Sequence, residues 1–165
     1  MTESQSSSEP RFLADVMLGT LAKWLRILGY DTLYNNRIED DEIVRLCLAE
    51  SRIALTRDTR LVKRRLLRQS LLIESVELGE QLRQVVAFLG GRLDKARLLT
   101  RCIECNSLLV PVAAESVKAL VPEYVFKTQS EFKQCPSCQR VYWGGTHRDQ
   151  IQKRLGKFLV FKTEA

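Results

Sequence analysis

The stretch that decides the fold class runs from Arg11 to Tyr34 and reads Arg-Phe-Leu-Ala-Asp-Val-Met-Leu-Gly-Thr-Leu-Ala-Lys-Trp-Leu-Arg-Ile-Leu-Gly-Tyr-Asp-Thr-Leu-Tyr. Its first five residues are a short apolar run that ends in an acid, which is typical of a buried strand. Leucines then recur at helical spacing up to Gly29, a residue suited to end a helix. The pattern predicts a strand, a helix and a second strand over residues 31–34.

The same alternation continues beyond this stretch. The later elements are expected as strands over residues 52–56 and 71–74, and as helices from Asp40 or Asp41, over residues 60–68 and over residues 78–89. Strands that alternate with helices at this spacing imply a parallel sheet flanked by helices. The sequence therefore predicts an α/β domain over residues 11–98.

Length and composition bound the class of protein. A chain of 165 residues with 45% hydrophobic and 28% charged residues is typical of a globular protein. Residues 1–10 fit neither a signal peptide nor a transit peptide, and we expect them to be a disordered tail, with a second tail over residues 158–165. No window approaches the roughly 20 apolar residues that span a bilayer. We therefore expect a cytoplasmic protein without membrane contact.

Two Cys-x-x-Cys pairs stand in the C-terminal half. Their members are Cys102, Cys105, Cys135 and Cys138. In a reducing compartment such thiols are metal ligands more often than disulfides, and structural zinc takes four of them. Redox-active thiols or an iron site are the alternatives. A strand-forming segment follows each pair, and Asn106 tolerates the left-handed conformation that such a turn needs. We predict a closed structural zinc ribbon over residues 99–157, ending in a short helix from Thr146.

A basic segment lies between the third and fourth predicted strands. Residues 51–70 carry seven basic side chains against one acid, which accounts for the whole net charge of +6. Such a cluster attracts phosphates, although a basic run is about as often only the solvated face of a helix. We expect phosphate contacts from Arg57, Arg60, Lys63 and Arg64. Lys23 and Arg26 on the first helix are further candidates, with Trp24 in the core.

Acidic residues follow three of the predicted strands. Asp15 ends the first strand, Asp40 and Asp41 follow the second, and Asp58 follows the third. Ligands gather at the carboxyl ends of parallel strands, so these side chains are expected to converge. Each is alone also suited to cap a helix. With the basic segment they predict phosphodiester hydrolysis, in which all four are catalytic candidates and Asp15 and Asp58 hold Mg²⁺ or Mn²⁺.

Three residues near the second cysteine pair have open roles. His147 is the chain's only histidine, and it either contacts RNA, assists catalysis or makes a structural hydrogen bond at the start of a helix. Tyr142 and Trp143 are expected to be buried behind the ribbon hairpin, with stacking on bases as the alternative.

Four segments together resemble one known family. They are Phe-Leu-Ala-Asp-Val-Met-Leu-Gly-Thr-Leu-Ala-Lys-Trp-Leu-Arg-Ile-Leu-Gly-Tyr-Asp-Thr (residues 12–32), Leu-Thr-Arg-Asp (55–58), Arg-Cys-Ile-Glu-Cys-Asn (101–106) and Cys-Pro-Ser-Cys-Gln-Arg-Val-Tyr-Trp-Gly-Gly-Thr-His (135–147). They are similar to the Mut-seven C-terminal RNase domain family, which joins a PIN-like nuclease fold to a zinc ribbon. The resemblance covers Arg11 to about Leu155. It implies a ribonuclease with divalent cations at Asp15, one of Asp40 and Asp41, and Asp58.

The resemblance also implies zinc at the four cysteines. PIN-like sites often have a fourth acid near the next strand, and only Glu74 is a candidate here. We therefore predict a PIN-like domain over residues 11–98 followed by a zinc ribbon, acting on single-stranded RNA with structural zinc and catalytic Mg²⁺ or Mn²⁺. The alternative is a nucleic-acid-binding or scaffolding module with an incomplete nuclease site, and a redox protein is a third interpretation.

Overall fold

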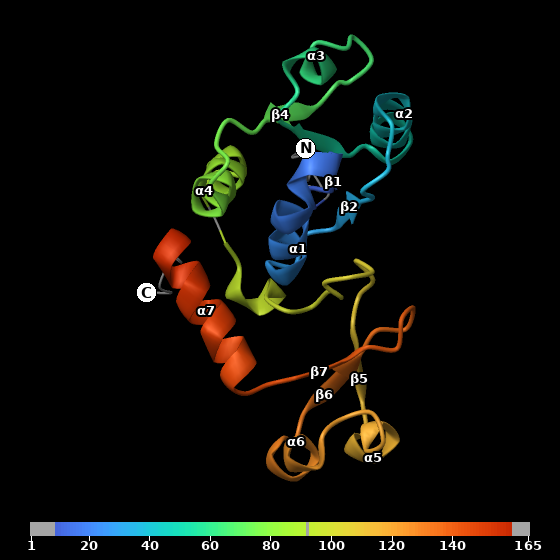
Figure 1. The fold of residues 1–165 in the computed structure, drawn as a ribbon, viewed down its shortest axis with the longest axis vertical. Helices are drawn as coiled ribbons and strands as arrows, with labels where there is room; N and C mark the ends of the chain where they lie inside the picture. The colour runs from blue at the N-terminus through green and yellow to red at the C-terminus, as the bar shows by residue number, and fades with distance from the viewer. Residues whose placement is uncertain (1–8, 92, 160–165) are drawn as a thin grey trace, which may run out of the picture.

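The structure is a computed structural model that describes residues 9–91 and 93–159, without the side chains of Thr146 and His147. It consists of an α/β part, a small cysteine-bearing ribbon, and a C-terminal helix that runs back toward the α/β part (Figure 1). The expected tails lie outside the described residues, apart from residues 9–10 and 158–159; of the latter, Phe158 ends the last turn of a helix and Leu159 is buried in a core, so the second tail begins later than predicted. Within the described ranges, no helix is both long and apolar enough to cross a membrane.

A parallel four-stranded sheet forms the centre of the α/β part. Its strands are β1 (Phe12–Ala14), β2 (Thr32–Tyr34), β3 (Ile53–Thr56) and β4 (Ser70–Leu72). They lie in the order β2-β1-β3-β4, with Leu13 of β1 in register with Leu33 on one side and Ala54 on the other. Parallel neighbours need crossover connections, which here are helical and cover both faces of the sheet. The predicted α/β class is confirmed.

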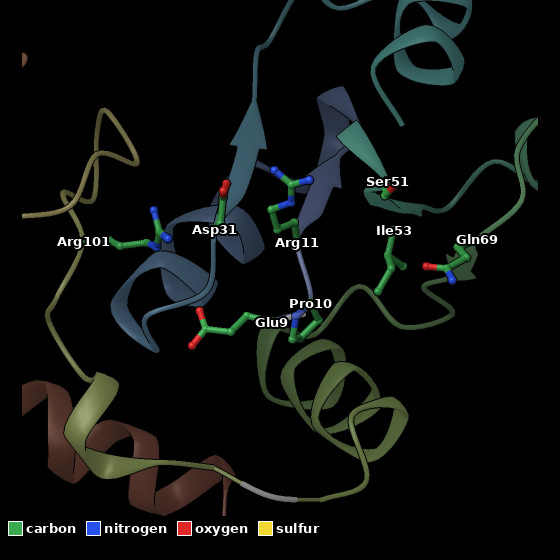
Figure 2. Close-up of a pocket in the computed structure, with 8 residues that line it drawn as sticks. All are labelled: Glu9, Pro10, Arg11, Asp31, Ser51, Ile53, Gln69 and Arg101. Atoms are coloured by element: carbon green, nitrogen blue, oxygen red, sulfur yellow. The ribbon is translucent and has the colours of Figure 1, made fainter. Parts of the chain in front are cut away.

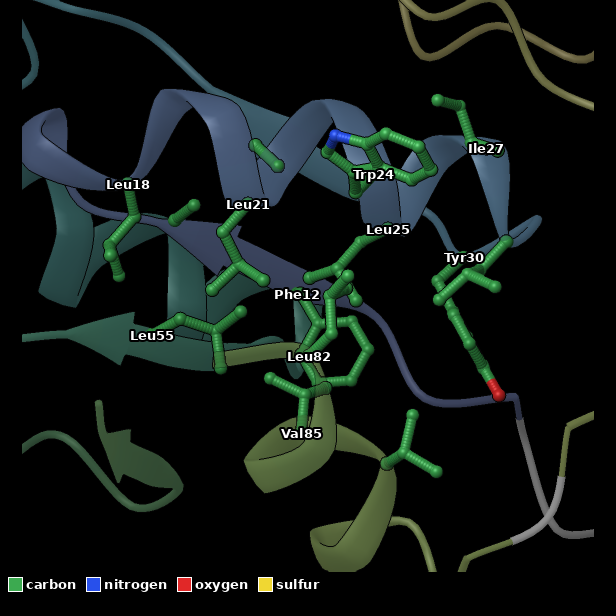
Figure 3. Close-up of a cluster of buried hydrophobic side chains, with 14 of the residues drawn as sticks. Phe12, Leu18, Leu21, Trp24, Leu25, Ile27, Tyr30, Leu55, Leu82 and Val85 are labelled. Carbon is green, nitrogen blue, oxygen red and sulfur yellow. The ribbon is translucent and has the colours of Figure 1, made fainter. Parts of the chain in front are cut away.

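The central strands divide their side chains between two cores. The helices around them are η1 (Val16–Leu18), α1 (Gly19–Ile27), α2 (Asp40–Glu50), α3 (Thr59–Val62), α4 (Leu78–Phe88) and η2 (Lys95–Arg97). Phe12 and Leu55 face α1 and α4, and the ring of Phe12 meets that of Tyr30 edge to face (Figure 3). Leu13 and Ala54 face α2 on the other side. This alternation follows from the two-residue period of a strand.

The basic segment is less helical than the sequence predicts. The helix expected over residues 60–68 ends at Val62, and turns follow until β4 begins. Leu61 and Leu67 are both buried in the core beside α2. Six residues turn an α-helix by about 600°, which would point these two side chains about 120° apart. The chain must therefore leave the helix between them in order to bury both.

The ribbon is a three-stranded antiparallel sheet. Its elements are β5 (Val110–Val112), α5 (Ala114–Val117), α6 (Glu123–Thr128), β6 (Phe132–Gln134) and β7 (Val141–Trp143), with the strands in the order β5-β6-β7. Val117, Val125 and Phe132 are buried in a small core of its own. The predicted ribbon with a strand after each cysteine pair is confirmed. The sequence analysis missed β6, which leads into the second pair, and the two short helices.

Helix α7 (Thr146–Phe158) belongs to the core of the α/β part. The sequence analysis groups it with the ribbon, whereas in the structure it packs against α4 (Figure 1). Ile151 and Leu155 are buried among residues of α1 and α4. Their i, i+4 spacing gives α7 an apolar stripe, which is buried against α1 and α4. The first core is therefore completed by α7, far along the chain from its other helices.

Candidate functional site

The four cysteines of the ribbon converge on one point. Their Sγ atoms all lie within 4.8 Å of one another, and those of Cys102 and Cys138 are 3.7 Å apart. None of the five cysteines, all of which the structure describes, is in a disulfide. An ion held tetrahedrally at about 2.3 Å from each sulfur requires sulfurs about 3.8 Å apart. The four residues therefore fit a single metal ion.

The two cysteine knuckles share one backbone geometry. Asn106 and Gln139, which follow the second cysteine of each pair, are left-handed with φ of 66° and 64°. The amide of each donates to the carbonyl of the first cysteine of its pair, at 2.9 and 3.0 Å. The amide of the second cysteine also points at the Sγ of the first, at 3.4 and 3.5 Å. The left-handed turn expected at Asn106 is confirmed.

Thiols held this close together cannot all ionise without a cation. Burial by itself would raise the pKa of Cys135, but the amides of Cys138 and Ser137 lower that pKa to about 7. A hydrogen bond with Cys138 is the main cause that raises the pKa of Cys105 to about 12. A bound cation removes this mutual repulsion and favours four thiolates.

One further side chain, missed by the sequence analysis as a site residue, touches the cysteine cluster. The hydroxyl of Tyr142 lies 3.2 Å from Sγ of Cys102 and accepts a hydrogen bond of 3.1 Å from the amide of Ile103. Because the hydroxyl oxygen already accepts from an amide, its own hydrogen is available to the sulfur. Contacts of this kind orient a metal ligand and hold it in place.

A second group of polar residues lies at the carboxyl edge of the parallel sheet. Asp15, at the end of β1, is only 5% exposed. Its two oxygens accept hydrogen bonds of 2.6 Å, one from the amide of Val16 and one from the hydroxyl of Thr56. The hydroxyl of Thr56 accepts in turn from the amide of Asp58 at 2.9 Å. Thr56 therefore joins the ends of the neighbouring strands β1 and β3.

Thr56 is a site residue that the sequence analysis did not single out, although it stands inside the quoted Leu-Thr-Arg-Asp segment. Asp58 also caps α3, where it accepts a hydrogen bond of 2.7 Å from the amide of Arg60. That amide is the main cause that lowers the pKa of Asp58 below its ordinary value. The carboxylate is therefore ionised at neutral pH, and capping does not exclude a role at this edge.

The structure places Asp40 and Asp41 in the first turn of α2, where both form ion pairs with Arg64. Their side chains are 47% and 92% exposed. Among the described residues, the four cysteines are the only group of three or more potential ligands whose atoms all lie within 4.8 Å of one another. The structure thus links Asp15 to Asp58 but does not bring the predicted carboxylates together as one cluster.

Glu74 follows β4 at the same edge of the sheet and is exposed. Its amide donates a hydrogen bond of 3.2 Å to the side chain of Gln84 on α4. This candidate for a fourth acid therefore lies at the end of the outer strand, next to β3.

The predicted phosphate contacts have different surroundings. Arg57, Arg60, Lys63 and Arg64 are all exposed in the segment around and after Asp58. Lys23 is half exposed and pairs with Glu104 of the first knuckle at 3.0 Å. The side chain of His147 lies outside what the structure describes.

Arg26 requires a correction, because its guanidinium is not available to phosphate. The residue is 5% exposed, and it donates to the carbonyl oxygens of Thr32 at 2.9 Å, Ile103 at 2.8 Å and Glu104 at 3.0 Å. Burial is the main cause that lowers its pKa. Arg26 instead ties the first cysteine knuckle to α1 and β2.

Asn106 strengthens the same junction from the ribbon side. Its side chain accepts a hydrogen bond of 2.9 Å from the amide of Thr32 and donates one of 2.8 Å to Asp31. Asp31 also pairs with the buried guanidinium of Arg52 at 2.7 Å. Burial would raise the pKa of Asp31, but the hydrogen bonds from Arg52 and Asn106 lower it. The sequence analysis missed these contacts because they join residues far apart in the chain.

A polar hollow of about 450 Å³ lies at the opposite edge of the sheet (Figure 2). Arg11 precedes β1, Ile53 begins β3 and Gln69 precedes β4, so these lining residues mark the amino ends of the strands. Asp15 and Asp58 follow the carboxyl ends of the same strands. The hollow is therefore separate from the predicted reaction edge.

The fold and its two polar groups define a mixed α/β protein whose ribbon carries four cysteines positioned to bind a metal ion. The model of the Mut7-C RNAse domain family matches residues 10–155, which is most of the chain. The chain therefore belongs to the Mut7-C RNAse domain family, and the resemblance seen in the sequence is confirmed. Membership of this family indicates a nuclease function. No match was found among curated proteins or among solved structures.

Proposed function

We propose that this chain is a divalent-metal-dependent ribonuclease that hydrolyses RNA at the carboxyl edge of its sheet. The observation that carries the proposal is the hydrogen-bonded link from Asp15 through Thr56 to Asp58. It joins two carboxylate residues of neighbouring strands at the edge where parallel α/β proteins bind ligands. Membership of an RNase domain family supports RNA as the substrate.

The donor set at this edge fits Mg²⁺ or Mn²⁺. Mg²⁺ is commonly bound through one or two carboxylates, with waters and substrate phosphates as its other ligands. Each oxygen of Asp15 accepts one hydrogen bond and keeps a second lone pair, so Asp15 and Asp58 would hold the ion together. When bound, the ion supplies charge neutralisation at the phosphate and a more acidic water.

The protein's own side chains then determine how the substrate lies. Thr56 and the amide of Val16 fix the orientation of the Asp15 carboxylate. Asp40 and Asp41 remain proposed catalytic carboxylates, and they would act at this edge only after their ion pairs with Arg64 open. An RNA phosphate is a suitable competitor for that guanidinium.

We assign phosphate binding to the exposed cations beside Asp58. These are Arg57, Arg60, Lys63 and Arg64. They flank the carboxylates, so a single strand that binds along them passes the reaction edge. Lys23 and His147 remain proposed RNA contacts, although they lie further from Asp58 in the sequence. Lys23 would contact RNA only after its ion pair with Glu104 opens.

We propose zinc as the ion of the cysteine site. Four thiolates at tetrahedral spacing are the usual ligands of structural zinc, and no position is left for a reacting group. The ion would therefore stabilise the ribbon and not take part in hydrolysis. Four reduced thiols also suit a reducing compartment such as the cytoplasm.

The test is cleavage of single-stranded RNA by pure protein, with and without added Mn²⁺. We expect cleavage only with the added ion, and a loss of about 100-fold or more in Asp15→Asn and Asp58→Asn. Glu123→Gln is the matched control, because Glu123 is an exposed acid on the ribbon and, among the described residues, pairs only with Lys127. Thermal unfolding of each variant shows whether the fold is kept. Undiminished cleavage by both aspartate variants would contradict the proposal.

The alternative of a binding module has one observation in its favour, since the predicted carboxylates do not meet as a single cluster. For that function, the same assay gives salt-sensitive RNA binding without any Mn²⁺-dependent product. The two functions are therefore separated by product formation alone.

A further inference from the structure

A small hollow lies between the ribbon and α7, away from the carboxylate edge. Its volume is about 120 Å³, and its walls include Ile103, Tyr142, Trp143, Gly144, Arg148 and Ile151. This volume is well below the roughly 300–1,000 Å³ of pockets for drug-sized ligands. It suits one planar ring system and not a whole nucleotide. We propose that this hollow binds an unpaired base of single-stranded RNA, and we call it the base pocket.

The aromatic wall of the base pocket is held rigidly before any ligand arrives. The hydroxyl of Tyr142 is fixed by Sγ of Cys102 and the amide of Ile103. Trp143 is partly buried and packs against the ribbon core that contains Phe132. Tyr142 and Trp143 are neighbours on β7 and so point to opposite faces of the strand: Trp143 lies on the side of the ribbon core, and Tyr142, which shares its face with Lys133, is the ring that would stack on a base. The two contacts of the Tyr142 hydroxyl leave this ring little freedom to lose on stacking. Stacking on such aromatic side chains is a common mode of binding to single strands.

The charges around the base pocket favour nucleic acid as the ligand. Lys133 and Arg148 line it together with one acid, Glu131. From Arg148 onward, α7 also carries Lys153, Arg154 and Lys157, against the single acid Asp149. Lys153, Arg154 and Lys157 are exposed on other sides of α7 than Arg148, and Arg154 lies 5.2 Å from the ring of Trp24, so Lys133 and Arg148 are the cations at the pocket itself. An aromatic hollow beside these cations provides contacts for both a base and its phosphates.

Helix α1 connects the base pocket with the reaction edge. The amide of Leu99, which lines the pocket, donates to the carbonyl of Ile27 at the end of α1. Asp15 stands immediately before the helical segment that begins at Val16. Residues 16–27 span about 18 Å at 1.5 Å per residue. An RNA strand with one base in the pocket would therefore bring a phosphodiester several nucleotides further along to Asp15. This expected position of cleavage rests on the proposed function.

Gly144 provides a way to fill the pocket without removing any of its contacts. A Cβ at this position would meet only the Gln129 side chain at 3.7 Å, which is ordinary contact. Because Gly144 itself lines the hollow, Gly144→Leu should keep the fold and obstruct the hollow at this position. Gly156→Leu is the matched control, because a Cβ there meets nothing within 4 Å and the residue is exposed on α7. Thermal unfolding and metal content establish that both variants are folded.

The experiment measures binding of fluorescent single-stranded RNA of about 12 nucleotides without Mg²⁺ or Mn²⁺, so that hydrolysis plays no part. We expect Gly144→Leu to raise Kd about tenfold or more, within the range of one stacked base, while Gly156→Leu binds like wild type. Duplex RNA of the same sequence should bind equally to all three proteins. Arg148→Glu should weaken binding and lower the slope of log Kd against log salt by at least about one.

Three outcomes would overturn the base pocket. In the first, Gly144→Leu binds the single strand like Gly156→Leu. In the second, it loses the same affinity for duplex as for single strand, which indicates phosphate contacts only. In the third, an acidic peptide of matched charge competes as well as RNA, which indicates a protein ligand. Cleavage by these variants with Mn²⁺, compared with Asp15→Asn, separates a failure of the pocket from a failure of the proposed hydrolysis.

Discussion

Replacement of Asn106 by glycine tests how the ribbon is joined to the sheet. Asn106→Gly keeps the left-handed backbone at φ of 66° and removes only the side chain. The change leaves the buried amide of Thr32 without its acceptor and takes one donor from Asp31. An unsatisfied buried amide costs about 1–3 kcal/mol, and a hydrogen bond to a charged group contributes about 1.5–3 kcal/mol. Because Asp31 keeps Arg52, we expect a net loss of about 3 kcal/mol.

The second knuckle supplies a matched control within the same chain. Gln139 has the same backbone conformation at φ of 64°, but its side chain is exposed and donates a hydrogen bond to the carbonyl of Pro136, beside it in sequence. Gln139→Gly should therefore stay within about 1 kcal/mol of wild type, since relief of the left-handed residue offsets the lost exposed contact. The difference between the two variants isolates the side-chain hydrogen bonds of Asn106.

Unfolding of the metal-bound protein, followed by circular dichroism, measures this difference. For a chain of this size, about 3 kcal/mol corresponds to a fall in Tm of roughly 6–12 °C. Hydrogen exchange at the amide of Thr32 should also accelerate in Asn106→Gly and not in Gln139→Gly. If the two glycine variants were equally stable, the contacts of Asn106 would not be what holds the ribbon against β2, and the reasoning would be refuted.

Three further predictions concern pH, a glycine and the metal. In the folded state the pKa of Asp31 lies below its ordinary value of 3.8. The ionised carboxylate therefore contributes fully to stability above pH 3.8, and this contribution is lost as the pH falls through the lower pKa of the folded state. Below about pH 4, the free energy of unfolding of Asp31→Asn should fall less than that of wild type. In Gly29→Ala the new Cβ would lie 2.3 Å from a backbone oxygen, whereas in Gly90→Ala, at a similar φ, it would meet open space. Gly90→Ala should therefore cost only the about 1–2 kcal/mol of a left-handed residue, measured by denaturant unfolding, and Gly29→Ala should cost more. Elemental analysis should find one metal ion per chain in wild type and much less in Cys135→Ser, which removes one of the four ligands. Cys47→Ala should keep the ion, because Cys47 is buried in the core beside α2 and not in the cysteine cluster.

Local sequence patterns predicted much of the fold and part of the site. The apolar run that ends at Asp15 forms β1, and the leucines after it bury one face of α1. The Cys-x-x-Cys spacing predicted both knuckles, including the left-handed residue at Asn106. The ends of the parallel strands then placed Asp15 and Asp58 at one edge of the sheet. These features depend on neighbours in the chain or on rules of strand order, so one sequence was enough.

Contacts between distant residues could not be predicted in the same way. Arg26 is one of several cations in the sequence, and only the knuckle folded against α1 turns it into a buried donor to carbonyl oxygens. The end of α3 at Val62 depends on where Leu67 finds a core. Similarly, the ion pairs of Arg64 with the start of α2 join two segments about 20 residues apart. In each case the deciding partner lies outside any local window.

The return of α7 to the first core makes the ribbon an insertion and not an appendage. The chain enters the ribbon from Leu98, which is buried against the α/β part, and leaves it into Ile151 and Leu155, which are buried in the same core. A cut at a single point after residue 98 would therefore strip the nuclease-family fold of its last packed helix. Removal of the ribbon with the first core intact therefore requires two cuts and a bridge between the anchored ends.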